Sequence, residues 1–192
     1  MWISDEGCWV IFVEFQPSAW SKGSYLNVNP HWLWLRYGAN VHFPRPADFI
    51  SFESVEQFKP LIENMASIAA RTVLDLRAKF RTLRDVNDLF AARVTRDGHP
   101  VYRAAITAGL VGDIAAARSL FQRMEATDME EFGPWIRNLT SDAAKFAALL
   151  DDPDGYRAAI LKAINEQRLN LRLPPLPTLE SMDSKGAARR AD

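Results

Sequence analysis

Residues 9–35, WVIFVEFQPSAWSKGSYLNVNPHWLWL, are the stretch that decides the fold of this chain. Side chains of a β-strand point alternately to its two faces, so apolar residues at every second position indicate one buried face. Apolar residues keep this spacing on both sides of a short polar loop, at Trp9, Ile11, Val13, Phe15, Leu26 and Val28. The sequence therefore predicts a β-hairpin whose apolar face must be buried against other elements.

The regions that flank this hairpin extend the predicted sheet. Trp2-Ile3 reads as the start of an earlier strand, and Pro30 marks a strand end, an edge or a bulge because proline cannot donate to the ladder. Residues 38–48 are predicted to form a loop from their glycine and proline content. We therefore expect a small antiparallel sheet within residues 1–36.

Composition and charge place the chain among ordinary globular proteins. The 192 residues are 48% hydrophobic and 24% charged, with a formal net charge of −1. This balance provides no general attraction to nucleic acid, and no apolar run approaches the length of a membrane span. The chain has one cysteine, Cys8, and no basic and apolar leader at its start, which favours a cytoplasmic protein.

After residue 52 the sequence becomes rich in Ala, Leu, Arg and Glu and reads as helices. Ser54 and Gln57 match a capping box, followed by a short turn and a main helix from about Pro60 to Leu83. Further helices are predicted at 85–96, at 100–126 as a pair with Asp113 as a cap, at 134–150 and from Asp152 to about Leu171.

These elements predict an α+β fold, with a small N-terminal antiparallel sheet packed against a long helix and a C-terminal helical bundle. We expect a single domain over residues 1–172, with its sheet part at about 1–52 and its helical part at about 53–172. Residues 173–192 carry prolines, small residues and charges without a period, which is typical of a disordered tail.

Two groups of residues are candidates for partner binding. Trp20, Lys22 and Tyr25 lie in or beside the polar loop, where an exposed aromatic residue is a common energetic centre of an interface. Trp20 folding back over the sheet is the equal alternative. Arg77, Arg81 and Arg84 are predicted to share one face of the long helix, as a basic face or as complements of the helix dipole.

Motifs for catalysis are sparse. The chain has no phosphate-binding glycine loop and no nucleophile elbow, and its three histidines lack the companions of a zinc site, so we predict no metal and no cofactor. Glu14 with His31 or His42 is the one acid–base pair that a small enzyme would use. The alternative for Glu14 is an ion-paired carboxylate at the rim of the sheet.

The hairpin resembles a large group of bacterial proteins that carry a domain of unknown function. The match rests on Gln16 and Ser18 at the strand end and on Tyr25, Asn27 and Asn29 of the return strand. The resemblance implies an α+β fold and assigns no activity. It also leads us to expect a helix and a strand before the hairpin, so we expect a shortened N-terminus and an open sheet edge that invites self-association.

Two functions follow from these observations. The first is a non-catalytic protein-interaction module that binds a protein partner or a second copy. The second is the acid–base enzyme built on Glu14. Nucleic-acid binding ranks third, because it would require the helical arginines to join a continuous basic face.

Overall fold

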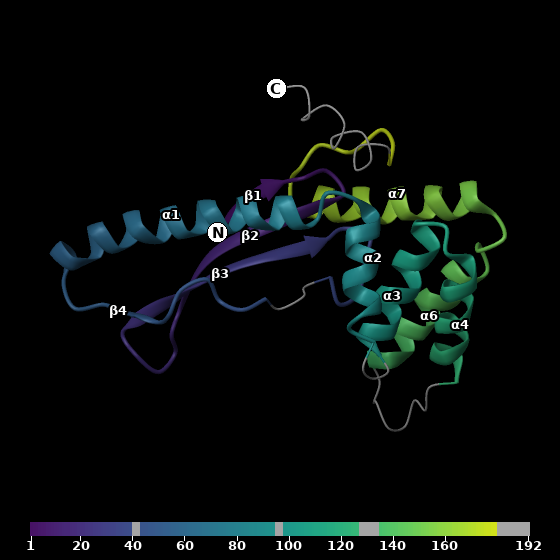
Figure 1. Ribbon diagram of the computed structural model, residues 1–192, viewed down its shortest axis with the longest axis horizontal. Helices are drawn as coiled ribbons and strands as arrows, with labels where there is room; N and C mark the ends of the chain where they lie inside the picture. Colours follow the sequence, from purple (N-terminus) through teal and green to yellow (C-terminus); the bar gives the residue numbers. More distant parts are fainter. Residues whose placement is uncertain (40–42, 95–97, 127–134, 180–192) are drawn as a thin grey trace. The chain divides into compact units, whose positions relative to one another are not determined.

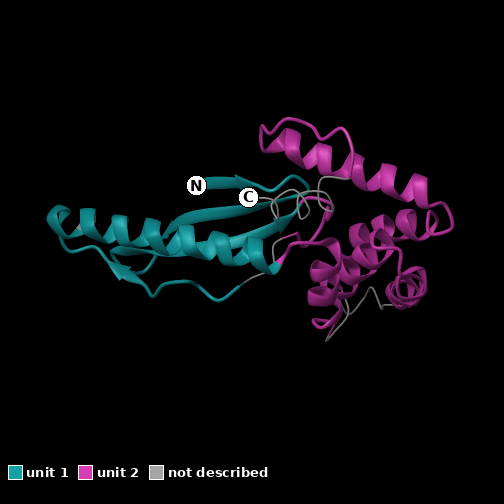
Figure 2. Ribbon diagram, turned by 45° about the horizontal axis from the view of Figure 1, so that its top comes forward, with its two compact units in different colours: residues 1–32, 40–79 teal, residues 33–39, 80–192 magenta. Residues whose placement is uncertain are grey.

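The computed structural model describes residues 1–39, 43–94, 98–126 and 135–179, and of Phe58 it describes the backbone alone. An N-terminal sheet is followed by helices, which confirms the predicted α+β class (Figure 1). The chain divides into two compact units, namely unit 1 with residues 1–32 and 40–79, and unit 2 with residues 33–39 and 80–192 (Figure 2). The single domain expected over residues 1–172 stays a prediction.

The sheet of unit 1 has four antiparallel strands in the order β1-β2-β3-β4. Its strands are β1 (Trp2–Asp5), β2 (Trp9–Pro17), β3 (Gly23–Trp32) and β4 (Ile50–Ser51). The predicted hairpin is confirmed, with Trp9 opposite Trp32, Val13 opposite Val28 and Phe15 opposite Leu26. The predicted strand at Trp2-Ile3 is confirmed as β1, whereas β4 lies in a stretch for which we predicted no strand.

Burial of the apolar face decreases along β2 toward the hairpin loop. Trp9, Ile11 and Val13 are at most 8% exposed, whereas Phe15 is 40% exposed. Pro30 is buried on the same face, on a stretch of β3 where the described residues place no outer strand. Of the three alternatives for this proline, the structure therefore selects the strand edge.

The long helix of unit 1 is α1 (Val55–Lys79), and it begins at the predicted cap. The Ser54 Oγ accepts a hydrogen bond from the Gln57 N–H, and the Gln57 Oε1 accepts one from the Glu53 N–H. The predicted separation of a short turn from a helix at Pro60 is wrong, because α1 runs through this proline. Pro60 lies inside α1, past its first turn, so the helix lacks the hydrogen bond that another residue there would donate to the Glu56 carbonyl.

The predicted continuation of this helix to Leu83 is also wrong, because a capping box starts the next helix earlier. The Thr82 Oγ1 accepts from the Asp85 N–H, and the Asp85 carboxylate accepts from the Thr82 N–H at 2.8 Å. This exchange fixes the start of α2 (Leu83–Ala91), two residues before the predicted start.

Unit 2 is helical in its described part. It contains α2, α3 (His99–Leu110), α4 (Ile114–Glu125), α6 (Trp135–Ala147) and α7 (Pro153–Asn170). Asp113 caps α4 and Asp152 caps α7, each accepting a backbone N–H three residues ahead, which confirms both predicted starts. No helix in the described ranges is both long and apolar enough to cross a membrane.

The first part of the predicted tail is held against α7. The Asn165 side chain donates to the Leu176 carbonyl and accepts from its N–H, and the Arg168 Nε donates to the Pro174 carbonyl. Residues 173–179 therefore differ from the expected disordered tail, because a buried arginine and an asparagine satisfy their backbone groups. The rest of the predicted tail, 180–192, lies outside the described residues.

A close helix contact in unit 2 gives a stability test. A Cβ atom at Gly109 would fall on the Tyr156 hydroxyl, which donates to the Ile106 carbonyl. The change Gly109→Ala should lower the free energy of unfolding by about 1–3 kcal/mol, as overpacking does. Urea denaturation measures this change. Helix propensity alone would stabilise the variant by about 1 kcal/mol, so a stabilised variant would contradict the contact.

Candidate functional site

The loop that joins β2 to β3 carries the most exposed tryptophan of the described chain. Trp20 is 95% exposed. The loop nevertheless has a defined backbone, because the Ser18 Oγ accepts from the Trp20 and Ser21 N–H groups, both at 3.1 Å. The Ser18 N–H also donates to the Gly23 carbonyl at 3.0 Å. The loop therefore presents the indole ring in solvent on an ordered turn.

Strand β4 closes the same end of the sheet. The Phe52 N–H donates to the Lys22 carbonyl at 3.0 Å, so the residues after β4 run beside the loop. Gly23 permits this approach, since a Cβ atom there would overlap the Ile50 carbonyl oxygen. The loop, β4 and the start of α1 therefore lie at one end of unit 1 (Figure 1).

A surface pocket of about 70 Å³ lies at this end. This volume exceeds the roughly 30 Å³ that one water molecule occupies in the liquid. The pocket is mainly apolar, and its lining comes from β2, β3, β4 and α1: Phe15, Gly23, Ser24, Ile50, Ser51, Phe52, Leu61, Ile62 and Met65. It accommodates part of an aromatic ring or a branched apolar side chain.

Exposed apolar side chains lie at the same end of unit 1. Phe15 is 40% exposed, Phe52 43%, and Val55 at the start of α1 73%. Together with Trp20 these residues are called the hairpin-end patch. A concentration of large apolar side chains in solvent at one end of a small unit is typical of an interaction surface.

Only part of the predicted partner-binding group belongs to this patch. Trp20 and Lys22 both lie exposed in the loop. Tyr25 points to the other face of the sheet, where its ring contacts the Phe49 ring and the Arg45 guanidinium at 3.9 Å from the ring centroid. The Arg45 Nε also donates to Asn27, so Tyr25 is engaged within its own unit.

The three arginines of the predicted basic face do not lie on one helix. Arg77 is on α1, Arg81 lies between two helices, and Arg84 is in the first turn of α2. The shared helix face that would join them does not exist, because α1 ends at Lys79.

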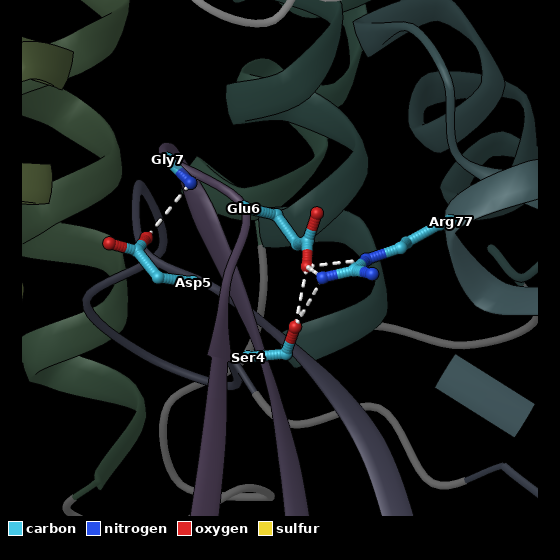
Figure 3. Close-up of polar contacts among 5 residues, drawn as sticks. All are labelled: Ser4, Asp5, Glu6, Gly7 and Arg77. Atoms are coloured by element: carbon cyan, nitrogen blue, oxygen red, sulfur yellow. Dashed lines mark hydrogen bonds and ion pairs between the residues drawn. The ribbon is translucent and has the colours of Figure 1, made fainter. Parts of the chain in front are cut away.

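Arg77 forms a compact polar cluster with β1 and the turn after it (Figure 3). Its Nε donates to the Glu6 Oε1 at 2.7 Å and its Nη2 donates to the Ser4 Oγ at 2.8 Å. The Ser4 hydroxyl, on a residue only 3% exposed, donates to the same Glu6 oxygen at 2.6 Å. This cluster ties the end of α1 to β1 within unit 1, which is a structural role.

Glu14 and His31, one of the two acid–base pairs predicted from the sequence, are not brought together. Glu14 is opposite Asn27 in the ladder, whereas His31 is opposite Val10. Four residues of strand separate these positions, which is about 13 Å. The His31 ring contacts the Phe12 ring, and His42 lies outside the described residues. Within the described ranges, no three His, Cys, Asp or Glu side chains gather to hold a metal, and Cys8 is buried and belongs to no disulfide.

Unit 2 contains a buried polar network that the sequence did not suggest. The Tyr102 hydroxyl donates to the Asp142 Oδ2 at 2.6 Å, and Arg36 pairs with Glu166 and lies 3.9 Å from Asp142. Burial and the Asp142 carboxylate raise the pKa of Tyr102 far above its usual value, and burial also raises the pKa of Tyr156. Both phenols therefore stay protonated and serve as hydrogen-bond donors.

His99 lies in the first turn of α3 and stacks on the Trp135 ring, with centroids 4.8 Å apart. Desolvation lowers the pKa of His99, and the nearby Arg103 lowers it further. Arg103 itself donates to the Gly38 carbonyl at 2.6 Å. The neutral imidazole is therefore the form that unit 2 favours.

Comparison of the chain with known proteins gave no match to a family model, to a curated protein or to a solved structure. The resemblance of the hairpin to a bacterial domain of unknown function stays a prediction.

The Arg77 cluster gives a second stability test. The change Arg77→Met removes the donors to Ser4 and Glu6 and should cost about 1–3 kcal/mol, because the polar groups left behind are largely buried. The control is Arg81→Met. The Arg81 side chain is exposed, so this substitution should change the free energy of unfolding by at most about 0.5 kcal/mol. Equal urea midpoints for the two variants would contradict the cluster's role.

His99 should make stability depend on pH. The unfolded chain protonates His99 near its ordinary pKa of 6.5, above the pKa in the folded chain, so unfolding takes up protons below that pH. Stability is therefore complete above pH 6.5 and falls as the pH decreases from there. Urea midpoints measured from pH 8 to pH 5 should show a smaller fall for His99→Gln than for the wild type. The control variant His31→Gln keeps His99. If the urea midpoints of His99→Gln depended on pH in the same way as those of the wild type and of His31→Gln, His99 would not be the source of the pH dependence.

Proposed function

We propose that this protein is a non-catalytic protein-interaction module whose contact surface is the hairpin-end patch of unit 1. The observation that carries the proposal is Trp20, 95% exposed on an ordered loop at the end of unit 1 that also holds an apolar pocket. Tryptophan is enriched among the few residues that dominate binding energies, because it buries a large area at a small entropic cost.

The order of the loop supports the same proposal. Ser18 and the Gly23 carbonyl hold the turn, and the Lys22 carbonyl is fixed by the Phe52 N–H. A surface that is already ordered before binding loses less conformational entropy on association. The loop is therefore suited to contact a partner without refolding.

Several polar groups of the described chain already have partners within their own units. Tyr102 and Asp142 are paired in unit 2, Glu6 and Arg77 are paired in unit 1, and Glu14 lies far along the sheet from His31. Arg77 is likewise occupied, which removes the centre of the basic face that nucleic-acid binding would require. The proposal includes a cytoplasmic bacterial protein, on the basis of a single buried cysteine and the hairpin resemblance.

Immobilised wild-type chain tests the proposal. An extract of host cells, supplemented with a tagged soluble copy of the same chain, is passed over it and retained proteins are quantified. Trp20→Ser should abolish the retention of at least one protein while far-UV circular dichroism stays unchanged, because the side chain makes little contact within its own unit.

Trp135→Ser is the matched control, since Trp135 is a second partly exposed tryptophan, on α6. It should retain the same proteins as the wild type. A set of retained proteins that is identical for wild type and Trp20→Ser would contradict the proposed function.

A further inference from the structure

The hairpin-end patch holds both a projecting side chain and a hollow. Trp20 projects from the loop, and the apolar pocket is lined by Phe15 of β2, by Phe52 directly after β4, and by Leu61 and Ile62 of α1. Trp20 is not among the residues that line this pocket. One end of one unit therefore carries an apolar side chain in solvent and an apolar site of matching chemistry.

Opposite charges accompany the two features. Lys22 is two residues from Trp20 and is exposed. Glu53 directly follows Phe52 at the pocket, and Glu56 lies in the first turn of α1, both also exposed. Two hydrogen bonds lower the pKa of Glu56, the first with its own backbone and the second with the Ser54 side chain. Glu56 therefore carries a negative charge at neutral pH. None of the salt bridges of the described residues includes Lys22 or Glu53.

We infer that the partner of the hairpin-end patch is a second copy of this chain. In the two-fold dimer, Trp20 of each copy enters the pocket of the other copy, and Lys22 of each copy faces Glu53 of the other. This inference rests on the proposed function and names its partner.

Symmetry is the reason to choose a second copy over an unrelated protein. A two-fold interface uses the same surface on both subunits, so that surface must be complementary to itself. The hairpin-end patch meets this requirement. It carries the apolar Trp20 with the cation Lys22, and the apolar pocket with the anion Glu53. An unrelated partner would need only one of the two features.

The size of the patch sets the expected strength. Two tryptophans bury roughly 150–250 Å² each, and the phenylalanines and Val55 add a smaller area. The total stays below the roughly 1,200 Å² at which standard specific interfaces begin, which places the dimer among weak, transient associations. The dimer should therefore form and dissociate within a measurable concentration range.

Sedimentation equilibrium of the full chain from about 1 to 200 µM tests the inference. The wild type should change from monomer to dimer. Trp20→Ser should weaken the dimer by about 1,000-fold, because the substitution removes a dominant residue, worth about 30-fold, from each of the two copies. Trp135→Ser should leave the dimer unchanged. A wild type that stays monomeric over the whole range, or a dimer equally strong in Trp20→Ser, would overturn the inference.

A mixing experiment then tests the charge contact between copies. Lys22→Glu and Glu53→Lys should each weaken their own dimer, because each places like charges across both contacts of the symmetric interface. An equimolar mixture of the two variants should form a mixed dimer of nearly wild-type strength, since both contacts then join opposite charges. An ion pair within one chain would not be restored by mixing, so an absent mixed dimer would overturn the Lys22–Glu53 contact.

The two proposals fail in different ways. If Trp20→Ser abolishes the retention of a host protein while the chain remains monomeric, the second-copy inference is overturned and the interaction function stands. If neither dimerisation nor retention depends on Trp20, both are overturned.

Discussion

The alternation of side chains along β2 and β3 is the constraint on which unit 1 depends. It collects Trp9, Ile11 and Val13 on one face, and their burial requires a cover. The amphipathic helix α1 belongs to the same unit, and its residues Leu61, Ile62 and Met65 reach the pocket at the far end of this face. Burial fades there, at Phe15, so an incompletely covered sheet end accounts for the exposed apolar surface.

Polar groups have two different roles in this chain. Ser4, Glu6 and Arg77 satisfy one another, as do Tyr102 and Asp142, so these groups stabilise their own units. At the hairpin end the hydrogen bonds instead order the backbone of the loop. The indole of Trp20 and the charged group of Lys22 are exposed to solvent. A rigid loop that exposes these two side chains is the basis of the proposed interaction.

The sequence was sufficient where local rules decide the structure. Period-two spacing predicted the hairpin, and Asp113 and Asp152 predicted two helix starts. It failed where a contact joins distant segments, because β4 pairs with Gly23 only once the intervening loop has returned to the sheet. Trp20 and Lys22 could therefore be predicted as site residues, whereas Phe52 and Val55 could not. The helix boundary at Lys79 was missed because an aspartate, rather than a glutamate, completes the capping box at Thr82.

Oxidative footprinting of tryptophan side chains by hydroxyl radicals tests the central claim most directly, because it reports the accessibility of Trp20 itself. The oxidation rates of Trp20 and Trp135 are compared in the wild-type chain at about 1 µM and about 200 µM, because a weak dimer is favoured at the higher concentration. The account predicts that Trp20 becomes several-fold less reactive at the higher concentration, whereas Trp135 keeps its rate. Equal protection of both tryptophans, or an unchanged rate at Trp20, would contradict association through the hairpin-end patch.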